Sequence, residues 1–366
     1  MISKQFKFIL IIYLSNIFAQ EVKWMSIGDL HNWYSAAGSE IEVGRTGQVS
    51  DQQDGLRYPA FYRVQDNQAA KGLWLGASNF YDPVVNKNYD KKVVHAGPRH
   101  LDIENETMPV KITMDGKYDH PNVFVDGDPA TNLQYLDYVD NVDPSLESDR
   151  KINNVVQTSL GVQMKRTIYA FAHPDHQNYH IQEYVFTNNG CFDKDCNTSY
   201  DQTLEGFQVY LQYRYAISRE GMVYDGNWLP QSAAWGHNTM NDVIGENPDA
   251  PSLNDQFYDD GEIMRAFFSW QGYHSDASFD NIGGPNAPGE GHLGAAQFVG
   301  VATLHADTSP NDNTDDVNQP STTWFITSDD PTTSGNDQYN ETKSINEYTN
   351  YMTVGHPEQT QAEIVG

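Results

Sequence analysis

Basic residues are scarce in this chain, with 22 lysines and arginines against 50 aspartates and glutamates among 366 residues. The formal charge is therefore −28 at pH 7. Binding to nucleic-acid phosphates needs clustered lysine and arginine, and an anionic membrane surface repels an acidic protein. This composition excludes nucleic acid as a partner. An acidic composition is typical of a well-solvated protein or of one that binds divalent cations.

Catalytic signatures are also absent. The sequence has no Gly-x-Ser-x-Gly elbow, no His-Glu-x-x-His and no phosphate-binding loop, which argues against serine hydrolases, zincins and nucleotide enzymes. His173, His176 and His180 have a spacing that would share one helix face and could hold zinc. Pro174 opposes a helix there, so we interpret the three as solvated or packed histidines.

Long hydrophobic runs are missing except at the N-terminus, where an apolar stretch from Phe8 to Phe18 follows two lysines and ends near Ala19. This order is typical of a secretory signal peptide, and the run is too short to be a transmembrane segment. We predict that residues 1–19 are removed and that the mature protein, beginning near Gln20, is extracellular or on the cell surface. Removal takes away two lysines and no acid, which leaves 20 basic against 50 acidic residues and a charge of −30.

Only two cysteines occur, Cys191 and Cys196. In an exported protein such a pair is expected to form a disulfide, here one that staples a short loop. A metal site that includes Asp193 and Asp195 is the alternative, but two thiolates make an incomplete zinc shell.

Helical periodicity is nearly absent, whereas 22 Tyr, 16 Phe, 28 Gly and 17 Pro favour strands joined by many loops. Residues 206–216 alternate apolar and polar side chains, as a half-buried antiparallel strand does. We predict a hairpin over 178–216 whose long loop carries the disulfide, with 161–172 as the neighbouring strand. The expected fold is all-β, an antiparallel β-sandwich with long acidic loops, over residues 20–306.

Further strands are predicted at Leu56–Val64, Gly72–Ser78, Met108–Met114, Ile263–Trp270, Ala295–Leu304 and Thr322–Thr327. Residues 307–366 are dominated by Asp, Asn, Thr and Ser, which indicates a polar, weakly ordered tail or the start of a truncated further region.

Three stretches, GLWLGA at 72–77, SDRKINNVVQTSLGVQMKRTIYAF at 148–171 and NYHIQEYVFTNNG at 178–190, resemble a broad group of secreted proteins of Bacteroidetes-like bacteria. The resemblance covers roughly the central half of the chain. It implies a large, β-rich exported protein, often with a type IX secretion sorting domain, and it carries over no catalytic residue. The C-terminus has no recognisable sorting domain, which agrees with truncation or with another export route.

Acidic loops offer oxygen ligands of the kind that calcium takes. Asp126 and Asp128 lie in one loop, and Asp259, Asp260 and Glu262 lie in another. A third acidic region holds Asp312, Asp315 and Asp316. None of these regions fits the EF-hand spacing, and for any single cluster a turn in which Asp binds its own backbone is the favoured interpretation. We expect Ca²⁺ as a stabilising ion at one or more of these loops.

Aromatic residues gather in a polar segment between predicted strands. Trp228 and Trp235 lie there among Asp, Asn, Gln and His, and Tyr224 and Tyr258 add to them. Exposed aromatic rings beside amides and carboxylates make a platform for a sugar, although the two tryptophans could instead close the end of the core. An extracellular glycan or surface component is the expected partner.

These observations predict a secreted or cell-surface, non-catalytic β-sandwich protein with a structural, adhesive or glycan-binding role. The alternative is a carbohydrate-active enzyme, a glycoside hydrolase or lyase, on the same scaffold. A glycosidase needs two carboxylates at a set separation. Glu183 and Glu262 lie in or next to predicted strands, but Lys165 or Arg166 could simply pair with Glu183.

Overall fold

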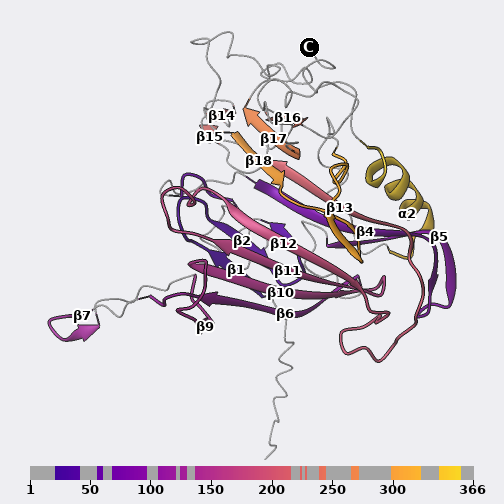
Figure 1. Cartoon of the computed structure of the whole chain (residues 1–366), viewed down its shortest axis with the longest axis horizontal. Coiled ribbons are helices and arrows are strands. Elements are labelled where there is room, and N and C mark those ends of the chain that lie inside the picture. Colours follow the sequence, from indigo (N-terminus) through magenta and orange to yellow (C-terminus); the bar gives the residue numbers. More distant parts are fainter. Residues whose placement is uncertain are drawn as a thin grey trace, which may run out of the picture.

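The computed structural model of this chain (Figure 1) describes residues 21–41, 56–60, 68–96, 106–120, 124–129, 137–215, 223–224, 227–228, 239–244, 265–271, 298–322 and 338–355. Strands dominate these residues, so the all-β class expected from the sequence is confirmed. The predicted signal peptide lies outside them.

The strands are β1 (Val22–Met25), β2 (Asn32–Ser35), β3 (Glu40–Ile41), β4 (Gln68–Asp82), β5 (Lys87–Ala96), β6 (Thr107–Gly116), β7 (Phe124–Val125), β8 (Asp128–Pro129), β9 (Asn141–Val142), β10 (Arg150–Thr158), β11 (Val162–Ala170), β12 (His180–Asn188), β13 (Glu205–Tyr215), β14 (Val223–Tyr224), β15 (Asn227–Trp228), β16 (Thr239–Ile244), β17 (Arg265–Gln271), β18 (Phe298–Thr303), β19 (Asp307–Ser309) and β20 (Asp312–Asp315). Two helical elements follow, α2 (Glu341–Glu347) and η4 (Tyr348–Met352).

Two sheets contain most of the described strand residues. The first sheet has the order β12-β11-β10-β6-β9, and the second has the order β13-β4-β3 with β5 also paired to β4. Within these two sheets every pair is antiparallel except β6 with β9. Strands β16, β17 and β18 form a separate antiparallel sheet. A sandwich topology stays a prediction.

Two apolar clusters lie on one face of the first sheet. One cluster joins it to the second sheet, with Leu73 and Leu75 of β4 packed among Val156 of β10 and Met164 of β11. The other joins it to the β1–β2 hairpin, with Met25 and Tyr34 packed on Ile112, Ile152 and Ile168. Because side chains alternate along a strand, β10 and β11 each contribute to both clusters from a single face.

The predicted hairpin over 178–216 is wrong. Strand β12 pairs with β11, as expected for 161–172, but β13 pairs with β4 in the second sheet. The Cys191–Cys196 disulfide is present and lies in the crossing segment. Gly190, with φ of 66°, turns the chain there, and its N–H donates to the Gly161 carbonyl. The segment thus connects two sheets instead of closing one hairpin.

Strand β12 turns the face that carries Gln182 and Tyr184 inward. Val185 is 44% exposed and Tyr179 is 39% exposed, whereas Gln182 and Tyr184 contact a buried lysine. The polar groups are tolerated inside because each finds a hydrogen-bond partner there.

Most of the other predicted strands are present. Gly72–Ser78 lies in β4 and Met108–Met114 lies in β6, while β17 and β18 occupy the predicted ranges near 263–270 and 295–304. Strands β5 and β10 were not predicted. The described part of Leu56–Val64 makes an isolated bridge between Arg57 and His31, and Thr322–Thr327 lies almost wholly outside the described residues.

Helix α2 and η4 pack against the second sheet on the side of β5 (Figure 1). Tyr348, Tyr351 and Met352 cluster with Trp74 and Val93. Residue 76 of β4 is glycine, and a Cβ there would lie 2.9 Å from the Tyr348 ring. These helical residues belong to the segment that the composition marked as a polar tail.

A buried histidine fastens α2 to the sheet. His95 Nδ1 lies 2.8 Å from a Glu106 oxygen, and its Nε2 lies 2.8 Å from a Glu347 oxygen at the end of α2. Burial alone would lower the pKa of His95, but the hydrogen bonds and charges of the two carboxylates raise it to about 9. An imidazolium between two carboxylates therefore bridges β5, the start of β6 and the helix.

We expect this contact to make stability depend on pH between about 6.5 and 9. The pKa of His95 is raised in the folded state, so the stabilisation is complete below about pH 6.5 and is lost as the pH rises through about 9. The full effect is about 3 kcal/mol. Urea unfolding at several pH values should show this loss in the native protein and not in His95→Gln, with exposed His173→Gln as the control. Parallel pH profiles for the native protein and His95→Gln would contradict it.

Candidate functional site

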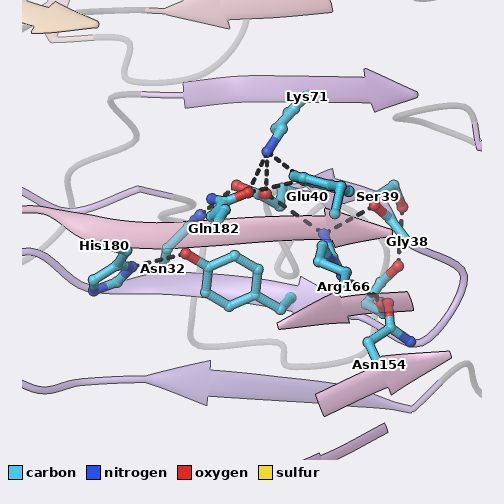
Figure 2. A network of polar contacts seen from close by, with 12 residues as sticks. Asn32, Gly38, Ser39, Glu40, Lys71, Asn154, Arg166, His180 and Gln182 are labelled. Atoms are coloured by element: carbon cyan, nitrogen blue, oxygen red, sulfur yellow. Dashed lines mark hydrogen bonds and ion pairs between the residues drawn. The ribbon is translucent and has the colours of Figure 1, made fainter. Parts of the chain in front are cut away.

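The candidate site is a buried polar network between the two apolar clusters (Figure 2). Along β10, Asn154 lies between Ile152 and Val156 on the inward face, and along β11, Arg166 lies between Met164 and Ile168. Both polar side chains are 0% exposed. The first sheet thus places a polar stripe where its two apolar clusters meet.

Glu40 is the central carboxylate of this network. It belongs to β3, where it pairs in register with Lys71 of β4. Its Oε1 lies 2.8 Å from Lys71 Nζ and 3.5 Å from Arg166 Nη1, so one oxygen contacts two cations. Its Oε2 accepts a 2.7 Å hydrogen bond from Asn32 Nδ2 and a weaker 3.4 Å one from Gln68 Nε2.

The two cations have further partners from the first sheet and from the N-terminal hairpin region. Lys71 Nζ donates to Gln182 Oε1 at 2.5 Å and to the Tyr184 hydroxyl at 2.8 Å, both on β12. Arg166 donates to the backbone carbonyls of Gly38 and Ser35 at 2.9 and 3.0 Å. Arg166 Nη2 also donates a 3.2 Å hydrogen bond to Asn154 Oδ1. Figure 2 shows Glu40 between Lys71 and Arg166.

A tyrosine and a histidine extend the network. The Tyr34 hydroxyl lies 2.7 Å from His180 Nδ1, and His180 Nε2 lies 3.0 Å from the Leu30 carbonyl. A carbonyl only accepts, so Nε2 carries the proton and Nδ1 accepts from the tyrosine. Burial lowers the pKa of His180 to about 4, which keeps this ring neutral at ordinary pH.

The charged groups of the network set one another's protonation states. Burial would raise the pKa of Glu40, but the charges of Lys71 and Arg166 outweigh it and lower that pKa. Burial would lower the pKa of Lys71, but the charge of Glu40 together with the Tyr184 and Tyr213 hydroxyls outweighs it and raises the pKa well above the usual value. Glu40 is therefore ionised and Lys71 protonated throughout the physiological range.

This arrangement is suited to holding strands together and poorly suited to proton transfer. Glu40 and Lys71 are 2% and 3% exposed, and each already has several partners. A general acid or base needs a pKa near the working pH and access to substrate. A small pocket between the sheets is lined by mainly apolar residues that include Leu75, Val94 and Met164, and none of the charged groups of the network line it.

Half of the predicted sugar platform lies outside the described residues. Trp228 and Tyr224 belong to the two-stranded β14–β15 hairpin, where Trp228 faces Val223 and Tyr224 faces Asn227 in the register. Trp235 and Tyr258 lie outside the described residues, so the platform stays a prediction.

The predicted calcium ligands are only partly described. Asp126 and Asp128 belong to the β7–β8 hairpin, where both are exposed and Asp126 has a φ of 53° beside Gly127 at 90°. Asp259, Asp260 and Glu262 lie outside the described residues. Among the residues that the structure places, no three His, Cys, Asp or Glu side chains gather as metal ligands do.

The remaining candidates separate from one another. His173 and His176 are exposed, whereas His180 is held by Tyr34 and Leu30. Glu183 is exposed and accepts a long 3.5 Å hydrogen bond from Tyr169. Its suggested partner Arg166 pairs with Glu40 instead.

Sequence reasoning missed Glu40 and Lys71. The available signal was a single lysine within the otherwise apolar run Ala69–Ala77, because such a charge needs a buried partner. Which acid supplies that partner depends on the pairing of β3 with β4, and a strand of two residues has no periodicity to detect.

Comparison of the chain with protein-family models, curated proteins and solved structures finds no match. Within the part of the chain that the structure describes, no helix has the length and apolar character needed to cross a bilayer.

We expect Glu40→Gln to lower the free energy of unfolding by about 3–5 kcal/mol, because it leaves Lys71 and Arg166 buried together without an anion. Urea unfolding should show this loss. Glu183→Gln, which neutralises an exposed carboxylate, is the matched control. The double variant Glu40→Leu with Lys71→Met should lower the free energy of unfolding by less than Glu40→Gln does. Equal stability of Glu40→Gln and the control would contradict the central role of the carboxylate.

Proposed function

We propose that this chain is a secreted or cell-surface, non-catalytic β protein with a structural, adhesive or glycan-binding role. The observation that carries the proposal is the closed ionic network: Glu40 pairs with both Lys71 and Arg166 in the interior, and all three charged groups are buried away from any substrate. A scaffold built in this way supports ligand-binding loops without taking part in catalysis.

Other features support the extracellular part of the proposal. The N-terminal sequence has the order of an export signal, the Cys191–Cys196 disulfide suits an oxidising compartment, and the acidic composition keeps an exported protein soluble. The polar segment with Trp228 and Trp235 is the part that we assign to glycan recognition.

A glycan array on the mature protein tests the binding role. We expect Trp228→Ala and Trp235→Ala to weaken binding at least tenfold, about 1.4 kcal/mol, because each removes an aromatic face that packs on a sugar ring. Tyr200→Ala, which removes an exposed aromatic ring beside the disulfide loop, is the control. Unchanged binding in both tryptophan variants would contradict the platform. Cleavage of the bound glycan would favour a glycoside hydrolase or lyase instead.

We also propose that calcium stabilises the loops. Asp126 and Asp128 supply two carboxylates on one exposed hairpin, and further ligands would come from the region of Asp259, Asp260 and Glu262. A cation that binds only the folded state stabilises it in proportion to the logarithm of its concentration above Kd.

Thermal melts in millimolar Ca²⁺ and in chelator, at matched ionic strength, measure this effect. We expect a shift of a few degrees at about a hundredfold excess over Kd, which Asp126→Asn combined with Asp128→Asn should reduce. Asp175→Asn, a change at an exposed aspartate elsewhere, should leave the shift intact. Coincident melting curves with and without calcium would show that the acidic loops serve solvation alone.

A further inference from the structure

A second lysine, Lys92, is buried against a carboxylate at the β4–β5 hairpin. Asp82 ends β4, and Lys92 lies within β5 after the turn. Lys92 Nζ is 2.9 Å from Asp82 Oδ2, and the two side chains are 0% and 2% exposed. The amine and the carboxyl carbon are therefore neighbours in a place closed to bulk water.

The surroundings hold both groups in place. The Lys92 nitrogen lies 4.6 Å from the Tyr89 ring centre and 4.5 Å from that of Tyr339, so aromatic faces flank the amine. Asp82 Oδ1 accepts hydrogen bonds from the backbone N–H groups of Val84 at 2.9 Å and Val85 at 3.3 Å. One carboxyl oxygen thus faces two fixed donors while the other faces the amine.

The Lys71–Glu40 ion pair has a similar separation of 2.8 Å but different surroundings from the Lys92–Asp82 pair. Glu40 is shared with a second cation, Arg166, whose charge helps to keep it ionised, and the ionised Glu40 raises the pKa of Lys71. Within the part of the chain that the structure describes, the ion pair of Asp82 is with a single cation, Lys92. Burial lowers the pKa of Lys92, and the charges of Asp82 and Glu106 offset this only in part.

We propose that Lys92 and Asp82 condense into an intramolecular amide cross-link, with release of one water molecule. The chemistry requires a neutral amine, and burial favours the uncharged form of Lys92. Groups held at this separation react as though at very high concentration, with effective molarities of about 10⁵–10⁸ M. The proposal does not depend on the function proposed above.

The step balances within the pair. One ammonium proton of Lys92 passes to Asp82 Oδ2 across their hydrogen bond, and the freed lone pair attacks Cγ to form the N–C bond. The negative charge then develops on Oδ1, where the N–H groups of Val84 and Val85 already point, as in an oxyanion hole. A second proton moves from nitrogen to the Oδ2 hydroxyl, the Cγ–Oδ2 bond breaks, and water leaves.

The product would be a covalent tie across the β4–β5 hairpin, between residues ten apart. Like a disulfide, it would restrict the unfolded chain, but reductants would not cleave it. Tyr339 precedes α2, so docking of that segment also closes the site.

Mass spectrometry of the full chain, folded, then denatured and reduced, tests the proposal. We expect the native protein to be lighter than its sequence by one water, with a branched peptide joining Asp82 to Lys92 after proteolysis. Lys92→Arg, which keeps the positive charge, should have its full mass. Asp82→Asn should still cross-link but lose ammonia in place of water. Peptides that contain Lys71 and Glu40 should remain unlinked and serve as the internal control.

Circular dichroism of each variant establishes that it is folded, so that a missing cross-link is not a failure to fold. Pro83 follows Asp82 and has no N–H, so a succinimide at Asp82 cannot mimic the loss of water. Uncondensed mass in the folded native protein, or a water loss that persists in Lys92→Arg, would overturn the proposal and leave an ordinary buried ion pair.

Discussion

The relative position of the two sheets and the N-terminal hairpin depends on one carboxylate. Glu40 contacts Lys71 of the second sheet and Arg166 of the first, and it accepts a hydrogen bond from Asn32 of β2. Three buried charged groups would be very costly if any one lacked its partners. The arrangement therefore requires the strands that carry them to take one relative position, which gives the network a role in specifying the fold as well as in stabilising it.

The placement of this network explains why the core is divided. Two apolar clusters occupy the same face of the first sheet, and the stripe formed by Asn154 and Arg166 lies between them. One cluster receives the second sheet and the other receives the β1–β2 hairpin. Apolar contacts are non-directional, whereas the hydrogen bonds of Arg166 to the Gly38 and Ser35 carbonyls are directional. The polar stripe thus positions the hairpin beside the second sheet.

The second sheet is covered on its other side by a segment far away in the sequence. The helix that ends at Glu347 is fastened through His95 to Glu106, and Tyr348 packs close to Gly76. Ionic and aromatic contacts of this kind make the docked helix part of the folded body. The three buried clusters around Glu40, His95 and Lys92 all involve β4 or β5, so this hairpin is the structural centre of the second sheet.

The sequence by itself determined the all-β class, the disulfide and the strands whose periodicity is strong, because alternation and cysteine pairing are local signals. Tertiary structure decided which strands pair: β12 and β13 belong to different sheets although they are consecutive. It also decided which face of β12 is buried, since the partner of Gln182 and Tyr184 is Lys71, more than a hundred residues away. A charge in an apolar strand predicts that a partner exists, but only the register of the strands identifies it.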